Sequence, residues 1–182
     1  MSFQIDTHHS EITFKVRHLM ISSVSGAFTD FKGTVEFAES NPANSEVNVE
    51  IDAASINTRD GMRDGHLKSP DFLDVANYPT IIFKSTDIHI IDAKNARVTG
   101  DLTMHGVTKP ATLKVEFLGK QKNPASGLVA AAFTASTKIN RKDWGLTWNM
   151  ALETGGVAVG DEISISIDAE LVEVPTAAAA TA

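Results

Sequence analysis

The chain has 182 residues, of which 42% are hydrophobic and 21% are charged. These values fit one globular domain with a real core and lie outside the range of disordered chains. Sixteen Lys and Arg residues against 23 Asp and Glu residues give a formal net charge of −7, which makes nucleic acid an unfavourable partner. The chain has no cysteine, so disulfides, thiolate metal sites and cysteine nucleophiles are excluded.

The start of the sequence indicates where the protein resides. Residues 1–8 contain no basic segment followed by an apolar run, as a secretory signal peptide would. No stretch approaches the ~20 apolar residues of a membrane-spanning helix. We therefore expect a cytoplasmic protein without stable membrane insertion, or a periplasmic one only if a precursor segment was removed.

Apolar and polar residues alternate through most of the chain, which is the pattern of half-buried strands. The alternation predicts about eight strands, over residues 12–20, 31–37, 47–53, 80–92, 97–104, 112–117, 129–139 and 163–171. Phe83 and Ile88 are out of phase with each other, which predicts a β-bulge between them. Residues 106–110 are expected to connect two of the strands as a hairpin. The fold class is therefore all-β.

Residues 59–74 interrupt the alternation and favour a short helix, with Met62, Leu67 and Phe72 on its apolar side. Such an insertion either covers one end of a barrel or packs on its wall. We expect a single β-barrel domain over residues 1–174, followed by a frayed low-complexity tail over residues 175–182.

The length of the predicted strands favours an enclosed cavity. Several strands run well beyond the usual length of about 5–6 residues, and eight antiparallel strands close around a lumen that holds side chains or one small ligand. Small residues would leave room inside, namely Gly33, Gly100, Ala130, Ala131, Ala132 and Ala135. Alternation alone does not separate a hollow barrel from a barrel or sandwich with a solid core.

Five blocks of sequence resemble a known family in the same order. They include Asp6-x-x-His9-Ser10, Gly26-x-Phe28-x-x-Phe31, Arg63-Asp64-x-His66-Leu67, Gly100-x-Leu102-Thr103-x-His105-Gly106, and Arg141-x-Asp143-x-Gly145. In these blocks the chain is similar to the YceI-like polyisoprenoid-binding proteins. The resemblance implies an extended lipocalin-like barrel that binds a long isoprenoid or a comparable fatty amphiphile, and a homodimer. Trp144 stands where the family usually has Phe.

We therefore predict a carrier, reservoir or sequestering protein for a long-chain lipid, without catalysis or a cofactor. The residues expected to contact the ligand are Phe14, Val16, Phe31, Phe37, Phe83, Leu102, Phe117, Phe133, Trp144 and Ile165. Two alternatives stay open. One is an enzyme that acts on an enclosed isoprenoid-like substrate, and the other is a stress or structural protein with a solid core.

The polar residues give little reason to expect catalysis or a metal. The common hydrolase, metalloprotease and nucleotide-binding motifs are absent from the sequence. No two histidines share the i, i+2 spacing that lets ligands converge on a strand, and His8 and His9 are expected on opposite faces of one. Arg63, Asp64 and the polar residues that follow them favour anchoring of the helix over binding of a lipid head group.

Overall fold

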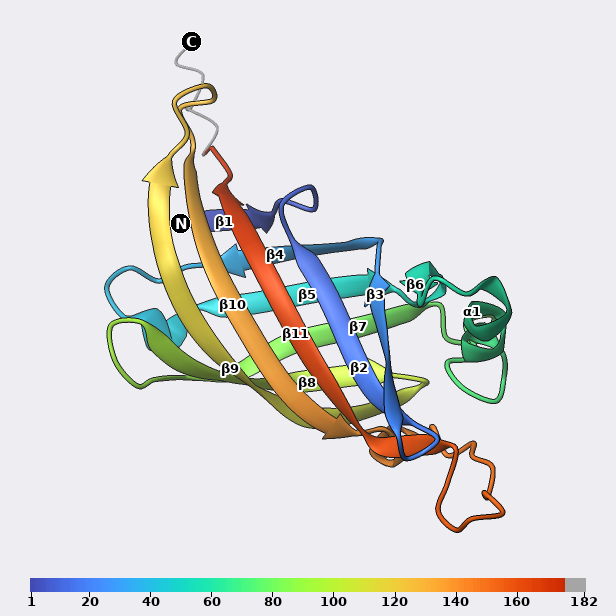
Figure 1. Ribbon diagram of the computed structural model, residues 1–182. Coiled ribbons are helices and arrows are strands. Elements are labelled where there is room, and N and C mark those ends of the chain that lie inside the picture. The colour runs from blue at the N-terminus through green and yellow to red at the C-terminus, as the bar shows by residue number, and fades with distance from the viewer. Residues whose placement is uncertain (176–182) are drawn as a thin grey trace.

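The computed structural model describes residues 1–175, in which strands of one continuous sheet wrap into a barrel (Figure 1). Its strands are β1 (Ser2–Ile5), β2 (Glu11–His18), β3 (Ser22–Phe28), β4 (Phe31–Glu36), β5 (Glu46–Asp52), β6 (Ile56–Asn57), β7 (Thr80–Ile90), β8 (Asn95–Met104), β9 (Val107–Lys122), β10 (Val129–Asn140) and β11 (Val159–Glu173). The helical elements are η1 (Pro42–Asn44), η2 (Ala53–Ser55), α1 (Gly61–Lys68) and η3 (Arg141–Trp144). In the described part of the chain, no helix is long and apolar enough to cross a membrane.

Eight strands close the barrel. They follow the order β1, β4, β5, β7, β8, β9, β10 and β11, and β11 pairs back onto β1. Each of these pairings is antiparallel. The predicted all-β class, with an eight-stranded antiparallel barrel and one short helix, is thus confirmed. Closure pairs each of these eight strands on both sides over part of its length, which reduces the free edge open to aggregation.

A second group of strands extends the wall beyond the barrel. Residues 159–168 of β11 pair with β2, β2 pairs with β3, and β3 pairs with the two residues of β6. The sequence pattern did not reveal β3, because Ser22, Ser23, Ser25 and Gly26 interrupt the apolar alternation. These residues form a strand through their pairing with β2 rather than through their own propensity.

Helix α1 begins where Asp60 accepts hydrogen bonds from the backbone N–H groups of Met62 and Arg63. An acidic N-cap of this kind satisfies donors that the helix itself leaves free. The helix was predicted to place Met62 on its apolar side, and this was wrong, because the Met62 side chain is 88% exposed. Leu67 and Phe72 do face the interior, so the buried side of this segment begins at its C-terminal end.

Two local predictions about the strands can be compared with the register. The bulge expected between Phe83 and Ile88 is present, as a register shift between Ser85 and Asp87. The connection expected over residues 106–110 is shorter than predicted, because β9 already begins at Val107. His105 and Gly106 alone make the turn, with φ angles of 52° and 72°, as a two-residue hairpin requires.

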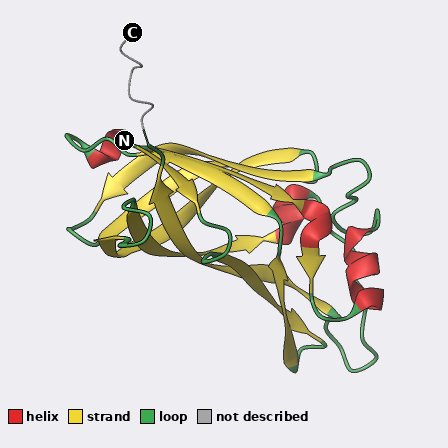
Figure 2. Cartoon of the chain, turned by 90° about the horizontal axis from the view of Figure 1, so that it is seen from above, coloured by secondary structure: helices red, strands yellow, loops and turns green. Residues whose placement is uncertain are grey.

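The two ends of the barrel differ, and Figure 2 shows short helical segments at both. We call the end that carries α1 and η3 the helix end. Its core is a cluster of buried side chains that includes Leu73, Met104, Trp144 and Leu146. We call the opposite end, which carries η1 and the β7–β8 turn, the mouth end. Most buried apolar packing therefore lies at the helix end.

Candidate ligand-binding site

A cavity of about 370 Å³ occupies the interior of the barrel. Small-molecule sites commonly have volumes of about 300–1,000 Å³, so the cavity has the size of a binding site. Its wall consists of residues from the barrel strands, from β2, β3 and β6, and from the segments around α1 and η3. Among residues 1–175, the polar residues on this wall are Thr13, Ser45, Thr137 and Arg141.

The space inside has a local cause in the sequence. Ala135 of β10 and Ala169 of β11 line the cavity with single methyl groups, where a larger residue would fill it. Gly33 and Gly100 act differently from what the sequence suggested. A Cβ atom at Gly100 would lie 2.5 Å from the ring of Phe83, and one at Gly33 would lie 2.5 Å from Ile5. These glycines make room for neighbouring side chains rather than for a ligand.

The helix end of the cavity is closed. Trp144 is 3% exposed, and its indole N–H donates to the carbonyl oxygen of Leu102 over 2.9 Å. The ring of Trp148 packs against His66 and Phe72, with centroid distances of 4.7 Å and 5.3 Å. This aromatic contact joins the α1 segment to the loop after η3, so two distant parts of the chain cover the same end.

Of the residues that the structure describes, Arg141 is the one charged residue on the cavity wall. It is 2% exposed, and burial lowers the pKa of its guanidinium, although Asp161 opposes this effect. Its N–H groups donate to four backbone carbonyl groups, those of Leu146, Trp148, Val159 and Gly160. With its donors engaged in this way, Arg141 anchors the loop over the cavity rather than offering a free charge to a ligand.

The polar residues at the start of α1 also anchor their own segment. The Asp64 carboxylate accepts from the backbone N–H and the hydroxyl group of Thr58, at 2.8 Å and 2.6 Å. Arg63 donates to the hydroxyl oxygen and the carbonyl oxygen of the same threonine. These contacts agree with the interpretation of this block as an anchor for the helix.

At the mouth end the cavity reaches the surface. Phe37 and Ile90 line the cavity, yet they are 37% and 42% exposed. Pro42 of η1 and Ser45 also lie on this part of the wall. A ligand that enters without rearrangement of the helix end would therefore pass between apolar side chains.

The predicted ligand-contacting residues fall into two groups. The cavity wall includes Phe14, Val16, Phe37, Phe83, Leu102, Phe133 and Ile165. Phe31, Phe117 and Trp144 are not on it. Trp144 lies in the core of the helix end, and Phe117 packs against Phe133 at a centroid distance of 5.2 Å. Contact with a ligand stays a prediction for the first group.

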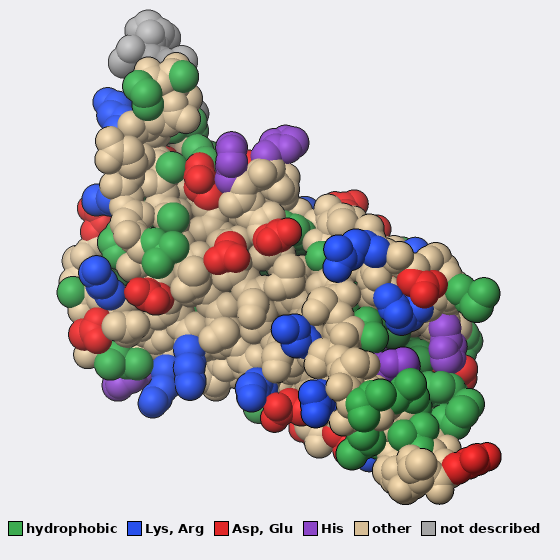
Figure 3. Space-filling model, in the orientation of Figure 1, with side chains coloured by type: hydrophobic (Ala, Val, Ile, Leu, Met, Phe, Trp, Pro, Cys, Tyr) green, Lys and Arg blue, Asp and Glu red, His purple; other side chains and the backbone are tan. Residues whose placement is uncertain are grey.

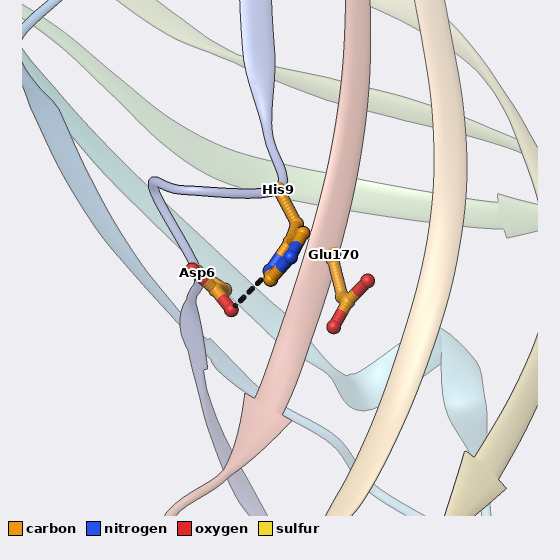
Figure 4. A group of neighbouring side chains, drawn as sticks. All are labelled: Asp6, His9 and Glu170. Carbon is orange, nitrogen blue, oxygen red and sulfur yellow. Dashed lines mark hydrogen bonds and ion pairs between the residues drawn. The ribbon is translucent and has the colours of Figure 1, made fainter. Parts of the chain in front are cut away.

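A polar cluster on the outside of the barrel was not foreseen. Asp6, His9 and Glu170 place their ligand atoms within 4.8 Å of one another (Figure 4). His8 and His9 were expected on opposite faces of a strand. This was wrong, because both lie in the turn between β1 and β2. Glu170 of β11 is remote in sequence from Asp6 and His9, so only the pairing of β11 with β1 brings the three residues together.

Hydrogen bonds join Asp6 to His9 and hold the backbone of Glu170 beside them. His9 Nδ1 lies 2.8 Å from Asp6 Oδ2, and the backbone N–H of His8 donates to the same carboxylate. The hydrogen bond to His9 lowers the pKa of Asp6, and in turn it raises the pKa of His9. The backbone N–H of Asp6 donates to the carbonyl oxygen of Glu170. We interpret the group as a structural contact at the position where β11 changes its partner strand from β2 to β1.

Comparison with known proteins agrees with this architecture. Residues 3–171 match the YceI-like domain. A UPF0312 protein of Pseudomonas savastanoi is 44% identical over 138 residues, which cover 76% of this chain and 71% of that protein. The YceI protein of Campylobacter jejuni is 32% identical, with a TM-score of 0.74 over 88% of this chain and 91% of that one.

A more distant structure shares the fold. A polyisoprenoid binding domain from Saccharophagus degradans is 17% identical, with a TM-score of 0.66 over 95% of this chain and 98% of that one. The closed sheet and the apolar interior define a small β-barrel with an apolar cavity that opens at one end. Within that class, the chain belongs to the YceI-like family.

Proposed function

We propose that this protein binds a long-chain isoprenoid or a similar amphiphilic lipid in the barrel cavity, as a carrier, reservoir or sequestering protein. The observation that carries the proposal is the cavity of about 370 Å³, whose wall is apolar except for four residues. The polyisoprenoid binding domain of Saccharophagus degradans, which has the same fold, supports an isoprenoid as the ligand. Binding alone suffices for this role, so no catalytic group is required.

The energetics favour exchange with a membrane over extraction from water. Burying one methylene group is worth about 0.8 kcal/mol relative to water, so a chain of tens of carbons would exceed any known affinity. A lipid of this kind starts in a bilayer, and its transfer between two apolar surroundings is nearly neutral. The cavity therefore needs only to be as apolar as lipid, while shape and head-group contacts set the balance.

A pair of matched variants tests the proposal. Ala135 lines the cavity, whereas its neighbour Ser136 points to solvent. We expect Ala135→Trp to fill the lumen and to reduce the amount of solanesol, a long-chain isoprenoid alcohol, that stays with the protein in gel filtration. Ser136→Trp should retain as much as the unmodified chain. Equal retention by both variants would show that the lipid does not enter the lumen.

We also propose that the chain forms a homodimer, as the family resemblance implies. Light scattering on the purified protein measures the mass in solution directly. A mass of one chain, about 19.5 kDa, at all concentrations up to the limit of solubility would overturn this second proposal without affecting the first.

A further inference from the structure

Three basic side chains form a row across the outer face of the barrel at the mouth end. His89 of β7 is paired with Arg97 of β8, and Arg97 is paired with Lys114 of β9. All three are exposed, because the residues that alternate with them, such as Ile90 and Ala96, face the cavity. Paired strands lie only about 4.8 Å apart, so the row concentrates basic groups next to the opening.

The row has no ion-pair partner among the described residues. None of their ion pairs within 4.0 Å involves His89, Arg97 or Lys114. The acidic residues nearest in register are Asp87, which is paired with Thr99, and Glu116, which is paired with Asn95; each lies two residues along its strand from the row. Arg97 and Lys114 carry like charges directly opposite each other on the sheet, which is destabilising. An external anion would remove that cost.

Apolar side chains are exposed beside the row. Phe37 and Ile90 are exposed where the cavity opens, and Ile91, which follows Ile90 directly, is 51% exposed. Exposed apolar groups next to a cavity opening are typical of a surface that contacts a partner or a membrane. The lower left of Figure 3 shows basic and hydrophobic side chains side by side.

A β-bulge adds one more apolar side chain to this surface. The register between β9 and β10 passes from Gly119 to Phe117, so Leu118 is the extra residue, and it is 57% exposed. Bulges at the rim of a barrel re-aim a side chain. The backbone N–H of Phe117 donates to Lys94 of the β7–β8 turn, which holds Leu118 close to that turn. We call Phe37, Ile90, Ile91 and Leu118 the mouth rim.

We propose that the mouth end docks on an anionic lipid bilayer, with the mouth rim at the apolar boundary and the basic row at the phosphate groups. The proposal rests on the function proposed above, because a carrier of isoprenoids must meet the membrane that holds them. Docking at the opening lets the chain of the lipid pass between bilayer and cavity without crossing water.

Charge favours a bilayer over a second copy of the chain as the partner. A symmetric dimer presents the same patch on both subunits, so two basic rows would meet at one interface and repel each other. An anionic surface complements the row instead. Because the whole chain carries a formal charge of −7, the anionic bilayer repels the rest of the molecule. This repulsion orients the barrel with its mouth end towards the bilayer.

Vesicle flotation of the full chain tests the docking surface. We expect binding to vesicles of phosphatidylcholine with phosphatidylglycerol, weaker binding to phosphatidylcholine alone, and loss of the difference at high salt. Lys114→Glu should weaken binding to the anionic vesicles by about tenfold or more, since each basic residue near such a surface contributes roughly fivefold. The same substitution places a carboxylate opposite Arg97, so it should keep or improve the stability of the fold.

Two further variants separate the mouth from the rest of the surface. Ile91→Ser should weaken vesicle binding, whereas Ile21→Ser, at the opposite end and 82% exposed, should leave it unchanged. Equal binding to both kinds of vesicle, or a loss with Ile21→Ser but not with Lys114→Glu, would overturn the proposal.

A parallel measurement keeps this proposal distinct from the proposed function. Lys114→Glu should still retain solanesol that is delivered by dilution from detergent, because its side chain faces away from the cavity. If the unmodified chain retains solanesol but binds no vesicles, docking is refuted and the lipid-binding function stands. If it binds anionic vesicles through Lys114 but retains no solanesol, docking stands and the lipid-binding function is refuted.

Discussion

Replacing Arg141 with methionine tests how the closed end of the barrel is held together. The methionine side chain of the Arg141→Met variant has an apolar stem of similar length but no hydrogen-bond donor. Four backbone carbonyl groups then lose this donor, at distances that now range from 2.6 Å for Leu146 to 3.3 Å for Val159. The carbonyl oxygen of Val159 keeps a second donor, the Asn149 side-chain amide at 2.7 Å. A buried acceptor left without a donor costs about 1–3 kcal/mol.

The total effect is smaller than four times that cost. Three of the four carbonyls belong to the half-buried residues Trp148, Val159 and Gly160, which water reaches more easily, and the variant no longer buries a charge. We therefore expect Arg141→Met to lower the free energy of unfolding by about 3–4 kcal/mol, within the range for breaking a buried polar network.

Urea unfolding followed by tryptophan fluorescence measures this loss, because the only two tryptophans, Trp144 and Trp148, lie in the segment that Arg141 anchors. Lys142→Met is the matched control. Lys142 is exposed and pairs with Asp161 over 3.1 Å, so its replacement should cost less than about 1 kcal/mol. If Arg141→Met costs no more than Lys142→Met, the assignment of Arg141 as an anchor is wrong.

Three more predictions follow from the local geometry. Leu19 and Met20 have positive φ angles of 52° and 64° in the three-residue connection between β2 and β3. Changing them to Asn and Gly, which tolerate such angles, should raise the free energy of unfolding by about 1 kcal/mol in urea; no gain would mean that their side-chain contacts offset the strain. Gly100→Ala brings a Cβ atom to 2.5 Å from the ring of Phe83 and should cost about 1–3 kcal/mol, and an unchanged melting temperature would contradict this. The hydrogen bond to Asp6 raises the pKa of His9 above 6.5. The contact between His9 and Asp6 therefore stabilises the fold below pH 6.5, and this contribution is lost as the pH rises through the pKa of His9 in the folded state. An NMR titration of His9 in Asp6→Asn should show the pKa moving down towards 6.5, and no movement would count against the hydrogen bond as its cause.

The alternation of apolar residues predicted the barrel because most strands present one face to the interior. The bulge near Ser85 was also predictable, since an extra residue shifts the phase of the pattern. Strand β3 was not, because its serines and Gly26 carry no apolar signal and its pairing depends on β2. Met62 was misassigned because a hydrophobic residue on a short helix does not by itself identify the buried face.

The cavity was predictable in part, and for physical reasons. Alternation identifies which residues point inward, and Phe14, Phe83, Leu102 and Ile165 line the cavity, although their contact with a ligand stays a prediction. It does not say how far along the axis the packing is solid. Trp144 points inward at the helix end, where the core leaves no space.

The contacts between remote segments needed the fold. Arg141 was a candidate either for a ligand or for the structure, and only the four carbonyl groups around it decide between these roles. Glu170 joins Asp6 and His9 through the register of β11, and the basic row of His89, Arg97 and Lys114 exists only because three strands are paired in one register. Sequence spacing carries no signal for such groups.

Native mass spectrometry of the freshly purified protein, followed by organic extraction, tests the central claim most directly. The account predicts a fraction of chains with one bound lipid, a long-chain isoprenoid or similar amphiphile in the extract, and uptake of one solanesol molecule by the chains that are empty. Chains that are uniformly empty, and that stay empty after incubation with solanesol, would contradict the claim that the cavity is a lipid-binding site.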